Sequence, residues 1–204
     1  MVLSHSYSIM LAGASNMILV MFNIFNYRFS IGFFFSLMSI VSWPICAETN
    51  GIMVGEITRA DLQENTTTKK WLDKNYLRYS PNTQIVNQSQ ALLVDVSITV
   101  FLGTWCHDSQ REVPALLKIL DTISFNPENL NIIALSVSKD TPSKREDAAH
   151  ISRTPTFIFY RNGREIGRYV EQAKKSLEQD ILDIVSGVDY RHYYADSSNL
   201  KNAH

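Results

Sequence analysis

Apolar residues are concentrated in short runs along the second half of the chain, and each run has strand length or helical spacing. Val96–Leu102 is a nearly continuous apolar run, which predicts a strand buried on both faces near the centre of a sheet. Leu130–Val137 predicts a second buried strand. The segment between them predicts a helix over residues 108–121. The apolar side of that helix is formed by Val113, Leu116, Leu117 and Leu120.

A β-hairpin is predicted further along the chain. Thr156–Tyr160 and Glu165–Val170 have the composition of strands, and the pair Asn162-Gly163 lies between them. Asn-Gly is the strongest short sequence signal for a tight hairpin, because both residues tolerate a positive φ.

A last helix is expected to begin after Ser176, which forms a capping-box pair with Gln179, and to end at Gly187. The charged stretch 139–147 is expected to be a surface loop or a short helix. The resulting order of strand, helix, strand, connection, hairpin and helix predicts an α/β fold. Its central mixed β-sheet would be flanked by helices.

The N-terminal part has a different composition. Residues 1–47 carry a single formal charge, Arg28, which lies just before the uninterrupted hydrophobic stretch 31–41. With the small residue Ala47 at its end, this segment predicts a cleaved signal peptide and export, most naturally to a bacterial periplasm. The alternative is an uncleaved membrane anchor facing the periplasm, because Phe29–Ala47 is uncharged and about long enough to span a bilayer.

The remainder divides into three predicted parts. Residues 48–90 are an N-terminal extension with an expected helix at 69–79, residues 91–187 form the α/β domain, and residues 188–204 form a polar, peripheral tail. The formal net charge is only −1 and no basic stripe is present, which argues against nucleic acid as a partner.

Cysteine usage points to a reactive thiol. The chain has two cysteines, and Cys46 would leave with the signal peptide, so that Cys106 remains alone. Structural cysteines in an oxidising compartment normally come in pairs. Cys106 also lies where a strand is followed by a helix, and the unpaired N–H groups and dipole of a helix N-terminus favour a thiolate.

Several motifs together resemble the thioredoxin superfamily. The sequence Trp-Cys-His-Asp-Ser at residues 105–109 is similar to its Trp-Cys-x-x-Cys site, and Pro114 matches its helix-kinking proline. Thr154-Pro155, followed by the hairpin and last helix, matches its cis-proline loop. The resemblance covers residues 91–187. The run Leu-Gly-Thr-Trp-Cys-His-Asp-Ser at 102–109 is also similar to the exported TlpA-related branch.

The differences from the superfamily pattern favour chemistry with one sulfur. Ser109 stands in place of the second cysteine of the motif, and Val100 in place of a buried acidic residue. The resemblance therefore implies a monothiol Cys-x-x-Ser site with Cys106 as nucleophile. Ser109 either donates its hydroxyl to the Cys106 sulfur or caps an N–H group of the first helical turn.

The resemblance also implies a set of substrate-binding residues. Thr154 and a cis Pro155 would present backbone to a bound partner strand. Trp105 either flanks the site or packs beneath it. His107 either lies beside the thiolate or is a surface residue, and Asp108 is favourable at a helix N-terminus.

Two residues just before Pro155 are further candidates. His150 and Arg153 either lie near the sulfur, where they could bind an acidic group of a partner thiol, or are ordinary surface loop residues. No metal and no cofactor are expected.

Two functions remain open. The first is an exported monothiol thiol-disulfide oxidoreductase that forms mixed disulfides on Cys106. Its partners would be protein or low-molecular-weight thiols and disulfides, glutathione among them, and it would contact a membrane only if the N-terminal segment is retained. The alternative is a redox-inactive binding module that uses the cis-proline groove. A peroxidase is less favoured, because Gly103 stands where such sites carry threonine.

Overall fold

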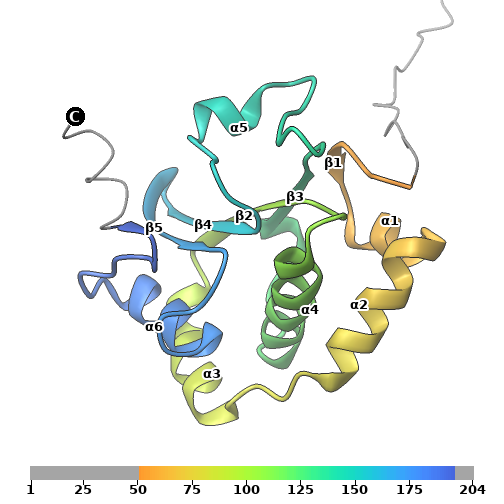
Figure 1. Cartoon of the computed structure of the whole chain (residues 1–204). Helices are drawn as coiled ribbons and strands as arrows, with labels where there is room; N and C mark the ends of the chain where they lie inside the picture. Colours follow the sequence, from red (N-terminus) through yellow and green to blue (C-terminus); the bar gives the residue numbers. More distant parts are fainter. Residues whose placement is uncertain (1–50, 196–204) are drawn as a thin grey trace, which may run out of the picture. The chain divides into compact units, whose positions relative to one another are not determined.

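A computed structural model describes residues 51–195, so the predicted signal peptide and the end of the predicted tail lie outside the described residues. Five strands form one mixed sheet in the order β1-β3-β2-β4-β5 (Figure 1). The strands are β1 (Gly55–Ile57), β2 (Val96–Leu102), β3 (Leu130–Ala134), β4 (Thr156–Arg161) and β5 (Arg164–Val170).

The predicted central strand is confirmed. β2 occupies the limits expected from its apolar run and lies in the middle of the sheet, parallel to β3 and antiparallel to β4. β3 is shorter than predicted and ends at Ala134. Beyond it the chain turns, and the N–H of Ser136 donates to the carbonyl of Asp140 at 3.1 Å.

The hairpin prediction is also confirmed. β4 and β5 pair antiparallel, and the two residues between them, Asn162 and Gly163, have φ values of 52° and 75°. Both values lie in the left-handed region that a tight hairpin turn of this type requires.

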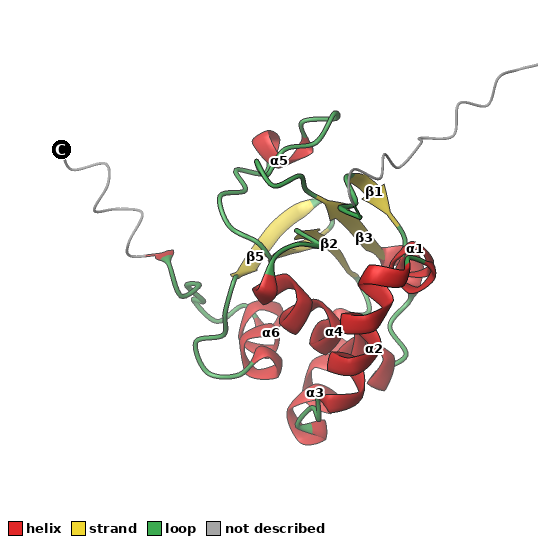
Figure 2. Cartoon of the chain, turned by 45° about the vertical axis from the view of Figure 1, so that its right-hand side comes forward, coloured by secondary structure: helices red, strands yellow, loops and turns green. Residues whose placement is uncertain are grey.

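Helices cover both faces of the sheet unequally. In Figure 2, α5 lies on one face, and the other helices lie together on the opposite face. The helices are α1 (Arg59–Glu64), α2 (Thr66–Arg78), α3 (Thr83–Gln90), α4 (His107–Thr122), α5 (Arg145–Ala148) and α6 (Leu177–Ser186).

The last helix begins and ends with the residues that the sequence indicates. The Ser176 hydroxyl accepts a hydrogen bond from the N–H of Gln179 at 3.2 Å, and Gly187 ends α6 with a φ of 77°. The Gln179 side-chain amide donates to Asp183 at 2.8 Å, so only the Ser176 half of the predicted capping box is formed.

The proline inside α4 has a direct structural consequence. Pro114 lacks an N–H and leaves the carbonyl of Gln110 without its helical partner. The side-chain amide of Asn75, from α2, donates to that carbonyl at 2.9 Å. A partly buried carbonyl is stabilised by such a partner, so the proline becomes a point at which α2 is attached to α4.

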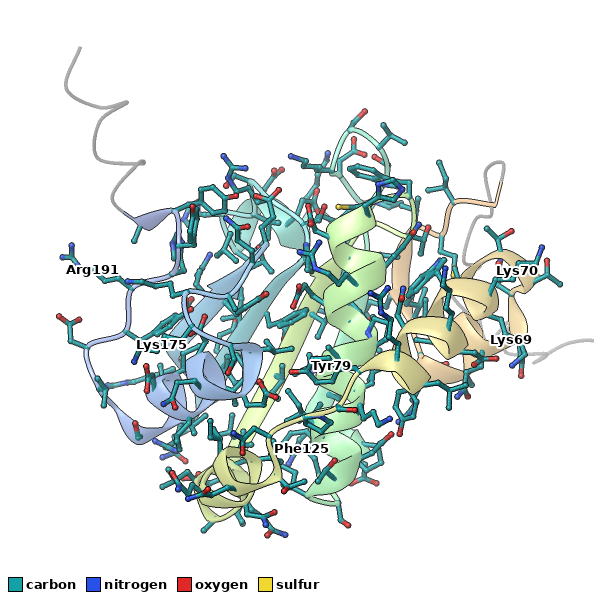
Figure 3. All side chains as sticks on the ribbon, turned by 60° about the horizontal axis from the view of Figure 1, so that its bottom comes forward. Lys69, Lys70, Tyr79, Phe125, Lys175 and Arg191 are labelled. Atoms are coloured by element: carbon teal, nitrogen blue, oxygen red, sulfur yellow. The ribbon has the colours of Figure 1, made fainter. Side chains whose placement is uncertain are left out.

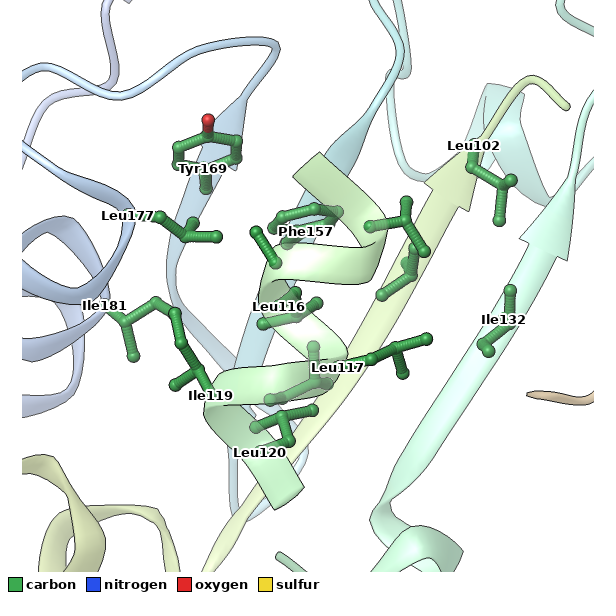
Figure 4. Packing of buried hydrophobic residues seen from close by; sticks show 14 of the residues in the cluster. Leu102, Leu116, Leu117, Ile119, Leu120, Ile132, Phe157, Tyr169, Leu177 and Ile181 are labelled. Atoms are coloured by element: carbon green, nitrogen blue, oxygen red, sulfur yellow. The ribbon is translucent and has the colours of Figure 1, made fainter. Parts of the chain in front are cut away.

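The core lies mainly between the sheet and the larger helical layer. Alternate residues of β2, including Val100 and Leu102, face this side, where they pack with α4 and α6 (Figure 4). Phe101 points to the other face, where it packs with Ile133 and Ile158 in a smaller cluster. Helices on both faces explain why β2 is apolar almost throughout.

The segment before β2 contributes more structure than its sequence predicts. The expected helix at 69–79 corresponds to α2, but β1, α1 and α3 were not predicted. β1 pairs with β3 at the edge of the sheet, and Leu62 of α1 and Val86 of α3 are fully buried in the main core. Residues 51–90 therefore pack together with the residues that follow them.

Candidate functional site

Cys106 lies at the carboxyl end of the central strand, at the N-cap position of α4. A tight turn leads into the helix, because the N–H of Cys106 donates to the carbonyl of Gly103 at 2.9 Å. Cys106 is partly buried, and it is the free cysteine among the described residues. Its position next to the first-turn N–H groups of α4 agrees with the sequence-based expectation.

Trp105 closes one side of this turn. Its indole N–H donates to the carbonyl of Leu135, just beyond β3, at 3.2 Å. A Cβ atom at Gly103 would lie only 2.7 Å from Cε2 of the indole ring, so the ring needs a glycine beneath it. Trp105 is half-buried, and therefore packs against the turn while part of it stays accessible beside Cys106.

The sulfur of Cys106 contacts the loop before β4. The thiol donates to the carbonyl of Thr154, with 3.2 Å between sulfur and oxygen. Thr154 and Pro155 are both buried, and the peptide bond between them is cis. The fold thus brings together Cys106 and the Thr154–Pro155 loop, which are 48 residues apart in the sequence.

Ser109 has a different environment from either of those expected for it. Its side chain is fully buried, and its oxygen accepts a hydrogen bond from the backbone N–H of Gly103 at 3.2 Å. This bond ties the first turn of α4 to the end of β2. The hydroxyl therefore satisfies the backbone before the helix, rather than the Cys106 sulfur or a first-turn N–H of α4.

The two residues between Cys106 and Ser109 face outward to different degrees. His107 is exposed at the first helical position. Asp108 lies in the first turn, where a negative charge is favourable, and forms an ion pair with Arg111 at 2.7 Å. Although partial burial lowers the pKa of Arg111, its hydrogen bonds to Glu112 and Asp108 raise it above the ordinary value.

Arg153 is held beside the cis-proline loop by residues that the sequence analysis did not single out. Its guanidinium donates to Glu171 at 2.7 Å and lies 3.9 Å from the ring centroid of Tyr194. The N–H of Glu171 donates to the carbonyl of Pro155 at 2.8 Å. No local sequence signal links these residues, because they come together only through the tertiary fold. His150 is exposed on the same loop.

The core directly below the site is apolar and aromatic. Val100 is buried in the same cluster as Phe157 and Tyr169, whose rings stack with centroids 5.0 Å apart. Burial, and then the nearby charge of Glu112, raise the pKa of Tyr169 far above its ordinary range. Val100, which stands where the superfamily pattern has a buried acidic residue, thus lies in a densely packed region.

Metal ligation finds no support in residues 51–195, where no three His, Cys, Asp or Glu side chains are grouped to hold a metal ion. The same residues include no helix that is long and apolar enough to cross a membrane.

A cavity of about 550 Å³ lies toward the other end of α4, where Leu117, Leu120 and Asp121 line it. None of the residues lining it belongs to the site around Cys106.

A cysteine at the start of a helix, facing a loop before an antiparallel strand of a mixed sheet, defines the thioredoxin-fold class. The family model for thioredoxin matches residues 76–183, and the chain belongs to the thioredoxin family.

Individual relatives agree with this assignment. A thioredoxin of Ictalurus punctatus is 31% identical over 83 residues, which are 41% of this chain and 74% of the relative. A thioredoxin-like protein of Acanthamoeba polyphaga mimivirus is 28% identical over 142 residues, which are 67% of this chain and 93% of the relative.

A solved structure shares the fold. The crystal structure of a protein of unknown function from Pseudomonas aeruginosa has a TM-score of 0.51 and 15% identity. The match covers 65% of this chain and 93% of that one.

Proposed function

We propose that this protein carries out thiol-disulfide exchange with the single sulfur of Cys106, through mixed disulfides with protein or low-molecular-weight thiols. The observation that carries the proposal is the position of that sulfur. It lies at the N-terminus of α4 and 3.2 Å from the carbonyl of Thr154, while Ser109 stands where a second sulfur would complete the motif. Membership of the thioredoxin family supports the same class of chemistry.

The proposed reaction has two exchange steps. Cys106 loses its proton to solvent, and its thiolate attacks one sulfur of a partner disulfide. A new bond forms between that sulfur and Cys106, the original disulfide bond breaks, and the second partner sulfur leaves as a thiolate that takes up a proton. An external thiol, or a second thiol of the partner, then loses its proton and attacks the partner sulfur of the mixed disulfide. A new disulfide bond forms between these two sulfurs, the bond to Cys106 breaks, and Cys106 takes up a proton as a free thiol. The electron pair comes from that thiol, so no cofactor is needed.

We further propose that residues 1–47 direct export, and that the protein works in a bacterial periplasm as a member of the TlpA-related branch. The support is the hydrophobic stretch 31–41 after Arg28, and the loss of Cys46 on cleavage. Retention of the segment as an anchor would place the same domain at the periplasmic surface of the membrane. Mass measurement of the protein isolated from its native cells distinguishes these two forms.

Trapping of disulfide-linked partners in the native cells tests the exchange function. With no second cysteine in the motif, adducts on Cys106 are expected to persist and to be recovered by non-reducing electrophoresis after acid quenching. Cys106→Ser is the control, and it is expected to recover none of them. Equal recovery of the same partners with Cys106→Ser would contradict the proposal.

A second function is favoured by one specific observation. The cis Thr154–Pro155 loop is held in place by the N–H of Glu171, which donates to the carbonyl of Pro155 at 2.8 Å, although Ser109 stands in place of a second sulfur. This supports a redox-inactive module that binds partners along the cis-proline groove. In that case Cys106→Ser would leave partner binding unchanged, and Cys106 would be alkylated no faster than a free cysteine at the same pH.

A further inference from the structure

The segment that follows α6 is attached to the body of the protein by two tyrosines. Residues 188–195, named here the C-terminal strap, come after the left-handed turn at Gly187 and lie beyond the residues matched by the family model. In Figure 1 the strap is the dark blue end of the described chain, next to β5. The sequence predicted a peripheral tail, but the contacts of the strap are specific.

The first attachment is Tyr190. Its hydroxyl donates to the carboxylate of Asp180 at 3.0 Å, and Asp180 is fully buried in the first turn of α6. The same carboxylate accepts hydrogen bonds from the N–H groups of Lys174 and Lys175 at 2.7 and 3.3 Å. Tyr190 is therefore joined through Asp180 to the loop between β5 and α6; Figure 3 labels Lys175 of this loop and Arg191 of the strap.

The second attachment is Tyr194, and it lies closer to the site. Its ring stacks on the guanidinium of Arg153 at 3.9 Å, and its oxygen accepts a hydrogen bond from the side-chain amide of Gln172 at 3.4 Å. Burial and a hydrogen bond with Glu171 raise the pKa of the Tyr194 hydroxyl. Tyr194 thus touches both loops that meet beside the site.

These contacts place the strap one residue away from the partner of the reactive sulfur. Arg153 directly precedes Thr154, whose carbonyl accepts from the Cys106 thiol. The N–H of Glu171 donates to the carbonyl of Pro155, so the β5–α6 loop and the cis-proline loop form one continuous surface. A partner disulfide that reaches Cys106 beside Thr154 has this surface, with Tyr194 on it, along one flank.

We infer that Tyr194 is a specificity-determining residue, which narrows the approach to Cys106 so that small disulfides react in preference to disulfides on folded protein surfaces. The inference rests on the proposed exchange function. The ring occupies space beside Arg153 that a folded partner would have to share, whereas a small disulfide needs only the immediate surroundings of the sulfur. The stacking also fixes Arg153 in place against Glu171.

The test compares two probes that carry the same reactive bond. One is bis(2-hydroxyethyl) disulfide, and the other is a small folded protein whose single surface cysteine is capped with 2-mercaptoethanol. Rates of adduct formation on Cys106 are followed by intact mass in the wild type, Tyr194→Ala and Tyr193→Ala. Tyr193 is the matched control, because it is an exposed tyrosine of the same strap that contacts the edge of the Tyr194 ring.

Tyr194→Ala is expected to raise the rate with the protein probe by up to about fivefold, because a folded partner no longer has to displace a ring held by one exposed cation–π contact, and to change the small-probe rate less than about twofold. Tyr193→Ala is expected to leave the ratio of the two rates unchanged. Tyr194→Leu keeps an apolar side chain if the alanine variant is unstable, and is expected to shift the ratio in the same direction.

An unchanged ratio in the folded Tyr194 variants, or a slower reaction with the protein probe, would overturn the inference. Failure of the proposed function has a different signature: the small probe would form no adduct on Cys106 in any variant, the wild type included.

Discussion

Cys106 and Ser109 lie one helical turn apart, yet their side chains make separate contacts. The sulfur of Cys106 faces the carbonyl of Thr154, whereas the buried oxygen of Ser109 accepts from the N–H of Gly103. A serine in this position thus holds the strand-to-helix junction together. Replacing a sulfur by this hydroxyl removes the second redox partner and provides a backbone hydrogen bond.

This contact leads to a prediction for Ser109→Ala. The substitution leaves the buried N–H of Gly103 without its acceptor, so the free energy of unfolding in urea is expected to fall by about 1–3 kcal/mol. The rate of Cys106 alkylation by iodoacetamide is expected to change less than about twofold, because no hydrogen bond joins the two side chains. Ser152→Ala, at an exposed serine, is the control for stability. Unchanged stability together with much slower alkylation would favour a hydroxyl directed at the sulfur.

The sequence indicated which residues meet at the site more reliably than it indicated which partner each side chain contacts. The approach of Cys106 to Thr154 follows from the resemblance to the thioredoxin superfamily, which implied a cis-proline loop beside the cysteine. The role of Ser109 could not be read from its spacing, because a hydroxyl has several possible partners within one turn. Glu171 and Tyr194 were missed for another reason: their contact with Arg153 depends on how the end of the chain returns to the sheet.

At the level of elements, long apolar segments were predicted well and short polar ones were missed. β1 has three residues, and α1 buries one leucine, so neither has a period that can be recognised. A local signal for α1 does exist, since Thr58 and Asp61 form a capping box. α3 begins at Thr83, and the side chain of Asn82 caps it by accepting hydrogen bonds from the N–H groups of Gln84 and Ile85.

The start of α3 is joined to α6 by a buried carboxylate, and this contact has a pH dependence. Glu178 accepts from the N–H of Asn82 at 2.8 Å. Burial raises the pKa of Glu178, but hydrogen bonds from the backbone of Asn82 and from other donors outweigh it, and the net pKa is lowered from 4.5. The stabilisation is therefore present above the unfolded value and is lost as the pH falls through the lowered pKa.

Glu178→Gln is expected to lower the free energy of unfolding at pH 7 by about 1–3 kcal/mol, because a charged acceptor is replaced by a neutral one. The difference from the wild type should shrink as the pH is lowered below 4.5. Urea titrations from pH 7 to pH 3 measure it, with the exposed Glu64→Gln as control. A difference that stays constant or grows on acidification would contradict this assignment.

Across residues 51–195, the segment before residue 76 and the end of the sheet that leads to Cys106 share one core. The family model begins at residue 76, inside α2, yet Leu62 of α1 lies in the same buried cluster as Val100 and Leu116. Arg59 adds a bidentate contact near the end of α4. Its guanidinium donates to both carboxylate oxygens of Asp121, with distances of 2.7 and 2.8 Å. Residues before the family match therefore help to hold the helix that begins at Cys106.

Leu62→Ala is expected to destabilise the whole unit. Leu62 is 0% exposed, and its truncation in a packed core should cost about 2–5 kcal/mol, with one midpoint shared by tryptophan fluorescence and circular dichroism. Leu77→Ala is the matched control, because Leu77 is 76% exposed and should change stability by less than about 0.5 kcal/mol. Equal effects of the two substitutions, or separate midpoints, would show that the segment folds independently.

We propose that Cys106 is a working nucleophile with no resolving partner of its own. The most direct test of this proposal is the intact mass of the protein, lacking residues 1–47, after incubation with oxidised glutathione between neutral and mildly alkaline pH. One glutathione per chain is expected on Cys106, and it should persist until an external thiol is added and be absent from Cys106→Ser. An unmodified wild-type mass throughout that pH range would contradict it.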